Sequence, residues 1–175
     1  FDVSDIQGEF LTALMYTVLE YVYARAKENR TKKKAIIVDE IWELIGSKSN
    51  AKAAEIVLKI FKIIRGYGGA AIAATQDLND FFSLEDGKYG KGIINNCKTK
   101  IVLNLERDEA QAVQKLLSLS AEEYKEILHF ERGHGLLCTG GNNIPVWFRS
   151  SALEHQLITT DRKDLEQMYV QMGGA

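Results

Sequence analysis

The chain has 175 residues, and its 22 Lys and Arg against 24 Asp and Glu give a formal net charge of −2. This balance argues against a basic nucleic-acid-binding arm and against an acidic tail. A hydrophobic content of 46%, only two cysteines and the lack of any apolar run near the ~18 residues of a membrane span exclude a disordered chain, a disulfide scaffold and a membrane-spanning helix in this sequence.

The N-terminal part of the chain is predicted to alternate helices with short apolar strands. Residues 1–5 are expected to end a strand, and apolar side chains spaced three and four residues apart predict a helix from Gly8 to about Asn29. Residues 35–38 are apolar at every position, which is typical of a strand buried on both faces of a parallel sheet. A second helix is predicted from Asn50 to about Arg65, followed by glycines and by a second buried strand over residues 70–74.

The C-terminal part is expected to add one more buried strand, two short helices, a β-hairpin and a helical tail. The strand is predicted at residues 101–105, and the helices at 109–117 and 121–128, the latter with Ser120 as its N-cap. The hairpin joins residues 135–139 to residues 145–149, and the tail begins near Asp161. Because strands alternate with helices, we predict a single α/β unit with a mostly parallel sheet flanked by helices.

Two adjacent carboxylates, Asp39 and Glu40, follow the first apolar strand. Ligands of parallel α/β sheets bind outside the carboxyl ends of the strands, and burying a carboxylate pair without partners is costly. In the Walker B arrangement of P-loop ATPases, one carboxylate holds Mg²⁺ and a second orients or deprotonates the water that attacks the γ-phosphate. We therefore predict that Asp39 holds Mg²⁺, through water, and that Glu40 activates the attacking water. The alternative is a solvated strand end with two adjacent acids.

A second polar pair, Thr75–Gln76, follows the second strand. In a parallel sheet Gln76 could lie beside Asp39 and Glu40, where its amide can both donate to phosphate and accept from water. We predict that Gln76 senses the γ-phosphate and that Thr75 contributes to nucleotide binding. The alternative is a turn-forming Thr-Gln pair at a strand end.

Five segments follow one another in this order: Ile37–Glu40 with Trp42, Arg65–Gln76, Ile94–Ile101 with Asn96, Gly133–Leu137 and Thr159–Asp161. Together they resemble the C-terminal part of the type IV secretion and conjugative-transfer ATPases, the VirB-four and TraE-like group in the FtsK–HerA branch of RecA-like ATPases. Gly66 and His134 depart from the residues usual at their positions in that family.

The resemblance implies an ATPase that binds ATP and Mg²⁺ and works as a homohexamer. It also implies a cytoplasmic protein, peripheral at the inner membrane, where other components of the secretion channel are its partners. Arg65 would then reach into the nucleotide of the neighbouring subunit as an arginine finger, the alternative being a cation that meets a helix dipole. Asn96 is expected to cap a helix or tie a loop rather than to contact nucleotide.

The phosphate-binding loop G-x-x-x-x-G-K-[ST] is missing from the sequence. In the family that the sequence resembles, this loop lies well upstream. We therefore expect residues 1–175 to be the C-terminal portion of one RecA-like domain, an expectation that a first residue of Phe1 rather than Met fits. This portion alone is expected to bind ATP poorly and to hydrolyse none.

Two other functions compete with a secretion motor. The first is a DNA-translocating ATPase of the coupling-protein or HerA-like kind, which the net charge of −2 disfavours because a DNA-tracking ring must neutralise phosphates. The second is a non-catalytic oligomerisation or docking module. His129 and His134 lack a third nearby ligand and are not expected to bind metal, and Cys97 and Cys138 are expected to be core thiols.

Overall fold

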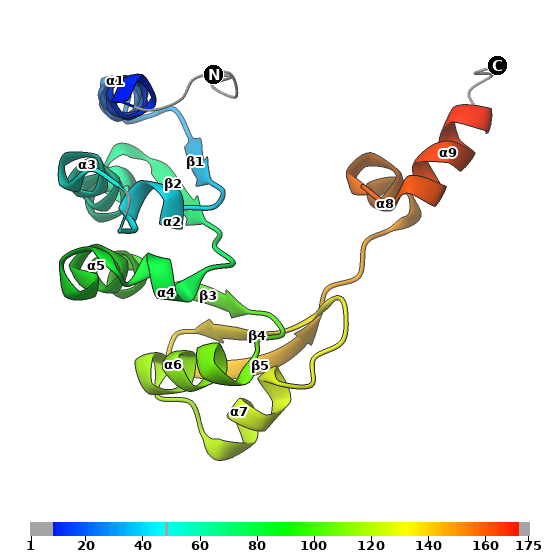
Figure 1. Cartoon of the computed structure of the whole chain (residues 1–175). Coiled ribbons are helices and arrows are strands. Elements are labelled where there is room, and N and C mark those ends of the chain that lie inside the picture. The colour runs from blue at the N-terminus through cyan, green and yellow to red at the C-terminus, as the bar shows by residue number, and fades with distance from the viewer. Residues whose placement is uncertain (1–8, 48, 172–175) are drawn as a thin grey trace. The chain divides into compact units, whose positions relative to one another are not determined.

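The structure is a computed structural model, and it describes residues 9–47 and 49–171. The chain divides into two compact units, residues 1–100 and residues 101–175 (Figure 1). The strand expected at residues 1–5 lies outside the described residues.

The first unit contains two strands and most of the long helices. Its helix α1 spans Glu9–Glu28, and the predicted helix from Asn50 is α3, Ala51–Ile63, where the Asn50 side chain accepts a hydrogen bond from the backbone N–H of Lys52 as the N-cap. A 3₁₀ turn, Ile64–Tyr67, ends that helix. The remaining elements were not predicted: α2 (Trp42–Ile45), α4 (Leu78–Phe81), a second 3₁₀ turn (Leu84–Gly87) and α5 (Lys88–Asn96).

Strands β1 (Lys34–Val38) and β2 (Gly69–Ala73) pair in parallel, with Lys34 opposite Gly69 and Val38 opposite Ala73. This confirms that the two apolar runs are parallel neighbours. Helices α1, α3 and α5 lie on one side of the two strands (Figure 1).

The expectation that both faces of these strands are buried is wrong. Burial alternates along each strand, and Ile37 and Ile72 are 71% and 51% exposed. The opposite face, which carries Ile36 and Val38, packs against the helices. In the described part of the chain, helices cover only this one face of the pair, so every second apolar side chain of the two strands is exposed.

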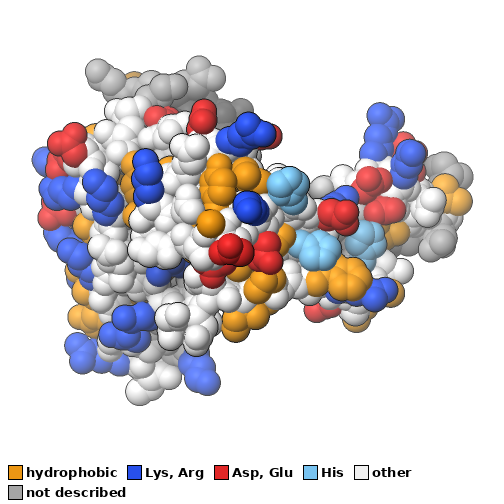
Figure 2. Space-filling view, turned by 90° about the horizontal axis from the view of Figure 1, so that it is seen from below, with side chains coloured by type: hydrophobic (Ala, Val, Ile, Leu, Met, Phe, Trp, Pro, Cys, Tyr) orange, Lys and Arg blue, Asp and Glu red, His pale blue; other side chains and the backbone are white. Residues whose placement is uncertain are grey.

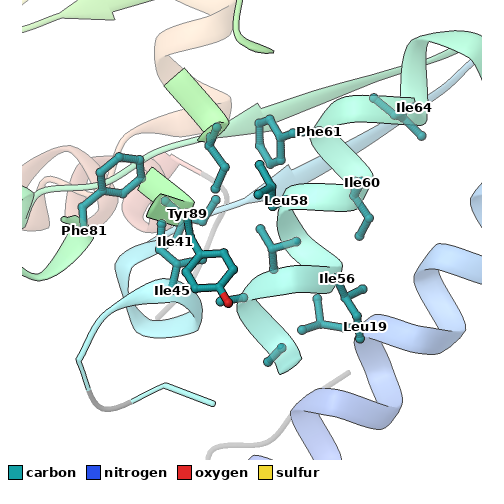
Figure 3. Close-up of a cluster of buried hydrophobic side chains, with 14 of the residues drawn as sticks. Leu19, Ile41, Ile45, Ile56, Leu58, Ile60, Phe61, Ile64, Phe81 and Tyr89 are labelled. Atoms are coloured by element: carbon teal, nitrogen blue, oxygen red, sulfur yellow. The ribbon is translucent and has the colours of Figure 1, made fainter. Parts of the chain in front are cut away.

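The core of the first unit is built between α3, α2 and α5 (Figure 3). Val57, Ile60, Phe61 and Ile64 point inward as the helical spacing predicts, and all are buried. Ile41 and Ile45 join this core from α2 and the residue before it, and they are 0% and 1% exposed. The segment that follows the acidic pair is therefore fixed to the core.

The second unit is formed around a three-stranded sheet in the order β3-β4-β5. β4 (His134–Thr139) and β5 (Asn142–Trp147) form the predicted antiparallel hairpin, turned by Gly140 and Gly141. Pro145 lies in β5, an edge strand of the sheet, where a missing N–H is tolerated. The helices are α6 (Arg107–Leu117), α7 (Ala121–Ile127), α8 (Ala152–Ile158), which was not predicted, and α9 (Arg162–Gln171). Ser120 caps α7 as predicted.

The strand expected at residues 101–105 is displaced. β3 spans Thr99–Val102 and is hydrogen-bonded to β4, not to β1 or β2. It is not the buried strand that was expected, since Ile101 and Leu103 are about half exposed. The α/β class is confirmed, with β1 and β2 paired in parallel and β4 and β5 paired antiparallel.

Candidate functional site

The acidic pair Asp39–Glu40 occupies a two-residue excursion at the carboxyl end of β1. The backbone N–H of Ala74 donates to the carbonyl of Val38 over 3.0 Å, and the N–H of Ile41 donates to the carbonyl of Ala74 over 3.0 Å. One residue of the neighbouring strand segment thus holds the chain on both sides of the pair. Asp39 and Glu40 lie outside the backbone hydrogen bonds between the two strand segments. Thr75 and Gln76 directly follow Ala74 in the sequence.

The backbone of Glu40 is left-handed, with φ of +46°. This region costs a residue with a side chain about 1–2 kcal/mol relative to the right-handed region. The Asp39 carboxylate accepts a hydrogen bond from the Glu40 N–H over 3.1 Å, which offsets part of that cost. Backbone strain of this kind concentrates at functional sites, where the surrounding structure holds it in place.

The Glu40 carboxylate is itself held. The indole N–H of Trp42 donates to Glu40 Oε2 over 2.7 Å, and Trp42 is half-buried against the core. Trp42 belongs to the first of the five sequence segments, but no role was predicted for it. The signal was available, because a half-buried tryptophan needs an acceptor for its N–H and a carboxylate lies two residues before it.

The two residues after β2 differ in their contacts. The Thr75 hydroxyl donates to the carbonyl of Asp77 over 3.2 Å, and the Asp77 carboxylate caps α4 by accepting from the N–H of Asp80 over 2.8 Å. This contact belongs to a turn, and the predicted part of Thr75 in nucleotide binding stays a prediction. Gln76 is exposed, and its side chain makes no hydrogen bond within residues 9–47 and 49–171. Its amide is available to a ligand.

The Asp39 carboxylate fits the requirements of Mg²⁺. This ion takes oxygen ligands and usually keeps several waters while it binds one or two carboxylates and the substrate phosphates. Asp39 is exposed, and the only hydrogen bond it accepts among the described residues is the one from the Glu40 N–H. No three His, Cys, Asp or Glu side chains gather as a metal cage in the described part of the chain.

Arg65 lies away from these residues. It is exposed in the 3₁₀ turn that precedes β2, whereas Asp39, Glu40 and Gln76 follow the carboxyl ends of the strands. The five residues of β2, at about 3.3 Å each, separate the two ends by roughly 17 Å. The structure therefore does not bring Arg65 to the acidic pair of its own chain.

Asn96 forms a hydrogen bond within its own helix, and the two cysteines are buried or half-buried. The Asn96 amide donates to the carbonyl of Gly92 over 2.8 Å, a bond inside α5 rather than the helix cap or loop tie that was expected. Neither cysteine forms a disulfide; Cys138 is buried and Cys97 is half-buried. Burial raises the pKa of Cys97 against a smaller opposite effect of Lys100, so its thiolate is disfavoured. This confirms the prediction of core thiols.

Comparison with known proteins identifies the family. The model of the TraG P-loop domain matches residues 3–139. Protein TraC of Escherichia coli (strain K12) is 32% identical over 94 residues, which are 53% of this chain and 11% of TraC.

Among solved structures, VirB4 of Thermoanaerobacter pseudethanolicus aligns with a TM-score of 0.77 and 25% identity, over 87% of this chain and 41% of that one. The genome packaging NTPase B204 of Sulfolobus turreted icosahedral virus 2, in complex with AMPPCP, has a TM-score of 0.57 at 15% identity over 80% of this chain and 63% of that chain, a similarity of fold alone. The matched part of the chain thus covers less than half the length of VirB4 and about a tenth of TraC.

These matches, together with a parallel strand pair that ends in an acid pair and a Thr-Gln, agree with the resemblance seen in the sequence. The chain belongs to the TraG P-loop domain family and is related to the ATPases of type IV secretion and conjugation.

Proposed function

We propose that this chain carries the water-activating half of an ATPase site in a motor that energises conjugative DNA transfer or type IV secretion. The observation that carries the proposal is the excursion of Asp39 and Glu40 beside Thr75 and Gln76, held from both sides by Ala74. The TraC and VirB4 relatives supply the biological setting. The solved complexes of B204 with AMPPCP and ATP-gammaS support a nucleotide as the ligand.

Each residue then has a chemical task. Asp39 would hold Mg²⁺, which when bound neutralises charge on the transferring phosphate. Glu40 orients the attacking water and accepts its proton. Gln76, with its exposed amide, reports whether the γ-phosphate is present. Thr75 acts through the turn that places Gln76.

The phosphate-binding loop has no counterpart in this sequence, so we place it elsewhere in the full-length protein. Backbone N–H groups of such loops provide most of the phosphate binding. Residues 1–175 alone are accordingly expected to hydrolyse no ATP.

The position of Arg65 favours action between subunits. Strand β2, roughly 17 Å long, separates Arg65 from the acids of its own chain, so Arg65 would serve as an arginine finger for a neighbour, which a ring such as a hexamer supplies. Within the described residues no helix is long and apolar enough to cross a membrane. We place the assembled ring at the cytoplasmic face of the membrane, bound there to other channel components.

DNA translocation is the second candidate, and charge disfavours it. The chain has a net charge of −2, and the face shown in Figure 2 carries its Lys and Arg side chains in small separate groups rather than in a stripe. Phosphate neutralisation dominates DNA affinity, so a DNA-tracking surface needs such a stripe.

The test measures ATP hydrolysis by the full-length protein. Glu40→Gln and Arg65→Ala are each expected to abolish turnover, while Glu55→Gln, an exposed acid on α3, is the matched control and retains it. Mixing the two inactive variants should restore activity, because some interfaces then pair an intact Glu40 with an intact Arg65. Full activity of Glu40→Gln would refute the catalytic assignment, and a mixture that stays inactive would refute action between subunits.

A further inference from the structure

Trp42 contacts the predicted catalytic carboxylate directly. Its indole Nε1–H donates to Glu40 Oε2 over 2.7 Å, which is short for an N–H···O hydrogen bond and typical of a charged acceptor. Trp42 opens α2 and is half-buried against the core. Ile41 and Ile45, on either side of it in the sequence, belong to that core (Figure 3). Packing therefore fixes the donor before any ligand arrives.

The backbone of Glu40 is equally restrained. Ile41, the residue after Glu40, is 0% exposed, and its N–H donates a hydrogen bond to the carbonyl of Ala74. The left-handed φ of +46° is kept by these contacts, so Glu40 cannot drift along the strand end. With the backbone held, the direction of the carboxylate depends on the one side chain that binds it.

One oxygen of that carboxylate remains available. Among the residues that the structure describes, Trp42 is the only hydrogen-bond donor to the Glu40 side chain, and it binds Oε2. A carboxylate offers about four acceptor positions on its two oxygens, so Oε1 can still accept from water. Trp42 thus holds Oε2 of Glu40 and leaves Oε1 open to water.

We propose that Trp42 is the positioning residue of the water-activating carboxylate, an inference that rests on the proposed function. The indole N–H fixes Oε2, and Oε1 accepts the proton of the attacking water. The water oxygen then bonds to the γ-phosphorus as the bond from phosphorus to the bridging oxygen of ADP breaks, and the proton stays on Glu40.

The competing interpretation of the same contact is a latch that must open before catalysis. The two differ in the effect of Trp42→Phe, which keeps an aromatic ring in the core but removes the N–H. Loss of a positioning contact lowers kcat, whereas loss of a latch raises it.

The first arm of the test needs no nucleotide. The chain has two tryptophans, so its ¹H–¹⁵N spectrum has two indole signals, and Trp147→Phe assigns the one from Trp42. Glu40→Gly, which suits the left-handed backbone, is expected to move the Trp42 indole proton upfield. Glu43→Ala, which removes the neighbouring acid of α2, is the control and should leave it in place. An indole proton unmoved by Glu40→Gly would overturn the contact.

The second arm measures ATP hydrolysis by the full-length protein. Trp42→Phe is expected to lower kcat about tenfold, part of the ~10²–10⁴-fold that a positioned general base contributes, with KM for ATP unchanged. In a Glu40→Gln background, Trp42→Phe should lower kcat no further, because Trp42 acts through Glu40. Equal losses in both backgrounds, or a raised kcat, would overturn the proposal.

The two arms separate this inference from the proposed function. A full-length wild-type protein that hydrolyses no ATP would overturn both the motor and the catalytic role of Trp42. The indole signal would still decide whether Trp42 holds Glu40.

Discussion

Glycine at position 40 should stabilise the protein relative to alanine, the reverse of the usual order. Both Glu40→Gly and Glu40→Ala remove the carboxylate and its bond to Trp42, so the variants differ only in Cβ. At φ of +46° the Cβ costs about 1–2 kcal/mol, while the greater freedom of glycine in the unfolded chain costs about 0.5–1 kcal/mol. Glu40→Gly is therefore expected to have the higher free energy of unfolding, by about 0.5–1 kcal/mol.

The measurement is urea-induced unfolding of the whole chain followed by tryptophan fluorescence. A Trp147→Phe background leaves Trp42 as the single tryptophan, so the signal reports the unit of residues 1–100. The same Gly and Ala pair at Glu55, in the middle of α3, is the control, and there alanine should be the more stable by about 1 kcal/mol. If alanine were also the more stable at position 40, the left-handed backbone and the strain argued for this site would be wrong.

Three further predictions concern stability, thiol reactivity and pH. Gly68→Ala should lower the melting temperature, because Gly68 has φ of +72° and an added Cβ would lie 2.5 Å from the carbonyl oxygen of Arg30, whereas Gly66→Ala meets nothing within 4 Å and should be neutral. Because burial raises the pKa of Cys97, iodoacetamide at pH 8 should modify it more slowly than a free cysteine, and fast modification of the folded chain would contradict this. The backbone N–H of Ser151 donates to the Glu154 carboxylate and lowers the pKa of Glu154. This cap should therefore stabilise α8 fully at pH values above the ordinary Glu pKa of about 4.3, and the stabilisation should be lost as the pH falls through the lowered pKa of the folded chain. NMR titration of Glu154 should show that lowered pKa.

The parallel strand pair could be predicted because its signal is local. Two short apolar runs, each ended by polar residues and separated by an amphipathic helix, specify β1, α3 and β2 with little help from the rest of the chain. The Asn50 and Ser120 caps belong to the same class of signal, since each side chain bonds a backbone N–H two or three residues on.

The exposed face of the strand pair could not be predicted in this way. Ile37 and Ile72 are apolar although solvent reaches them, so the sequence lacks the polar alternation that marks a half-exposed strand. The pairing of β3 with β4 is likewise decided by a partner more than thirty residues away, which no local pattern of residues 99–102 encodes.

Helix α5 shows tertiary packing overriding propensity. Its sequence contains Gly90 and Gly92, which weaken an isolated helix by about 1 kcal/mol each. Any Cβ on Gly90 would come within 2.5 Å of the carbonyl oxygen of Phe81. The glycine is thus needed for the close approach of α5 to the end of α4, and the buried Ile93 and Tyr89 supply the packing that holds the helix.

The spacing of the candidate site follows from the backbone ladder rather than from the side chains. Ala74 bonds Val38 on one side of the acids and Ile41 on the other, so the ladder leaves room for two residues between these bonds. The first, Asp39, accepts a hydrogen bond from the N–H of the second, and the second, Glu40, has a left-handed backbone. The acid pair thus occupies the two positions between these bonds, and the second position brings the Glu40 carboxylate to the Trp42 indole N–H.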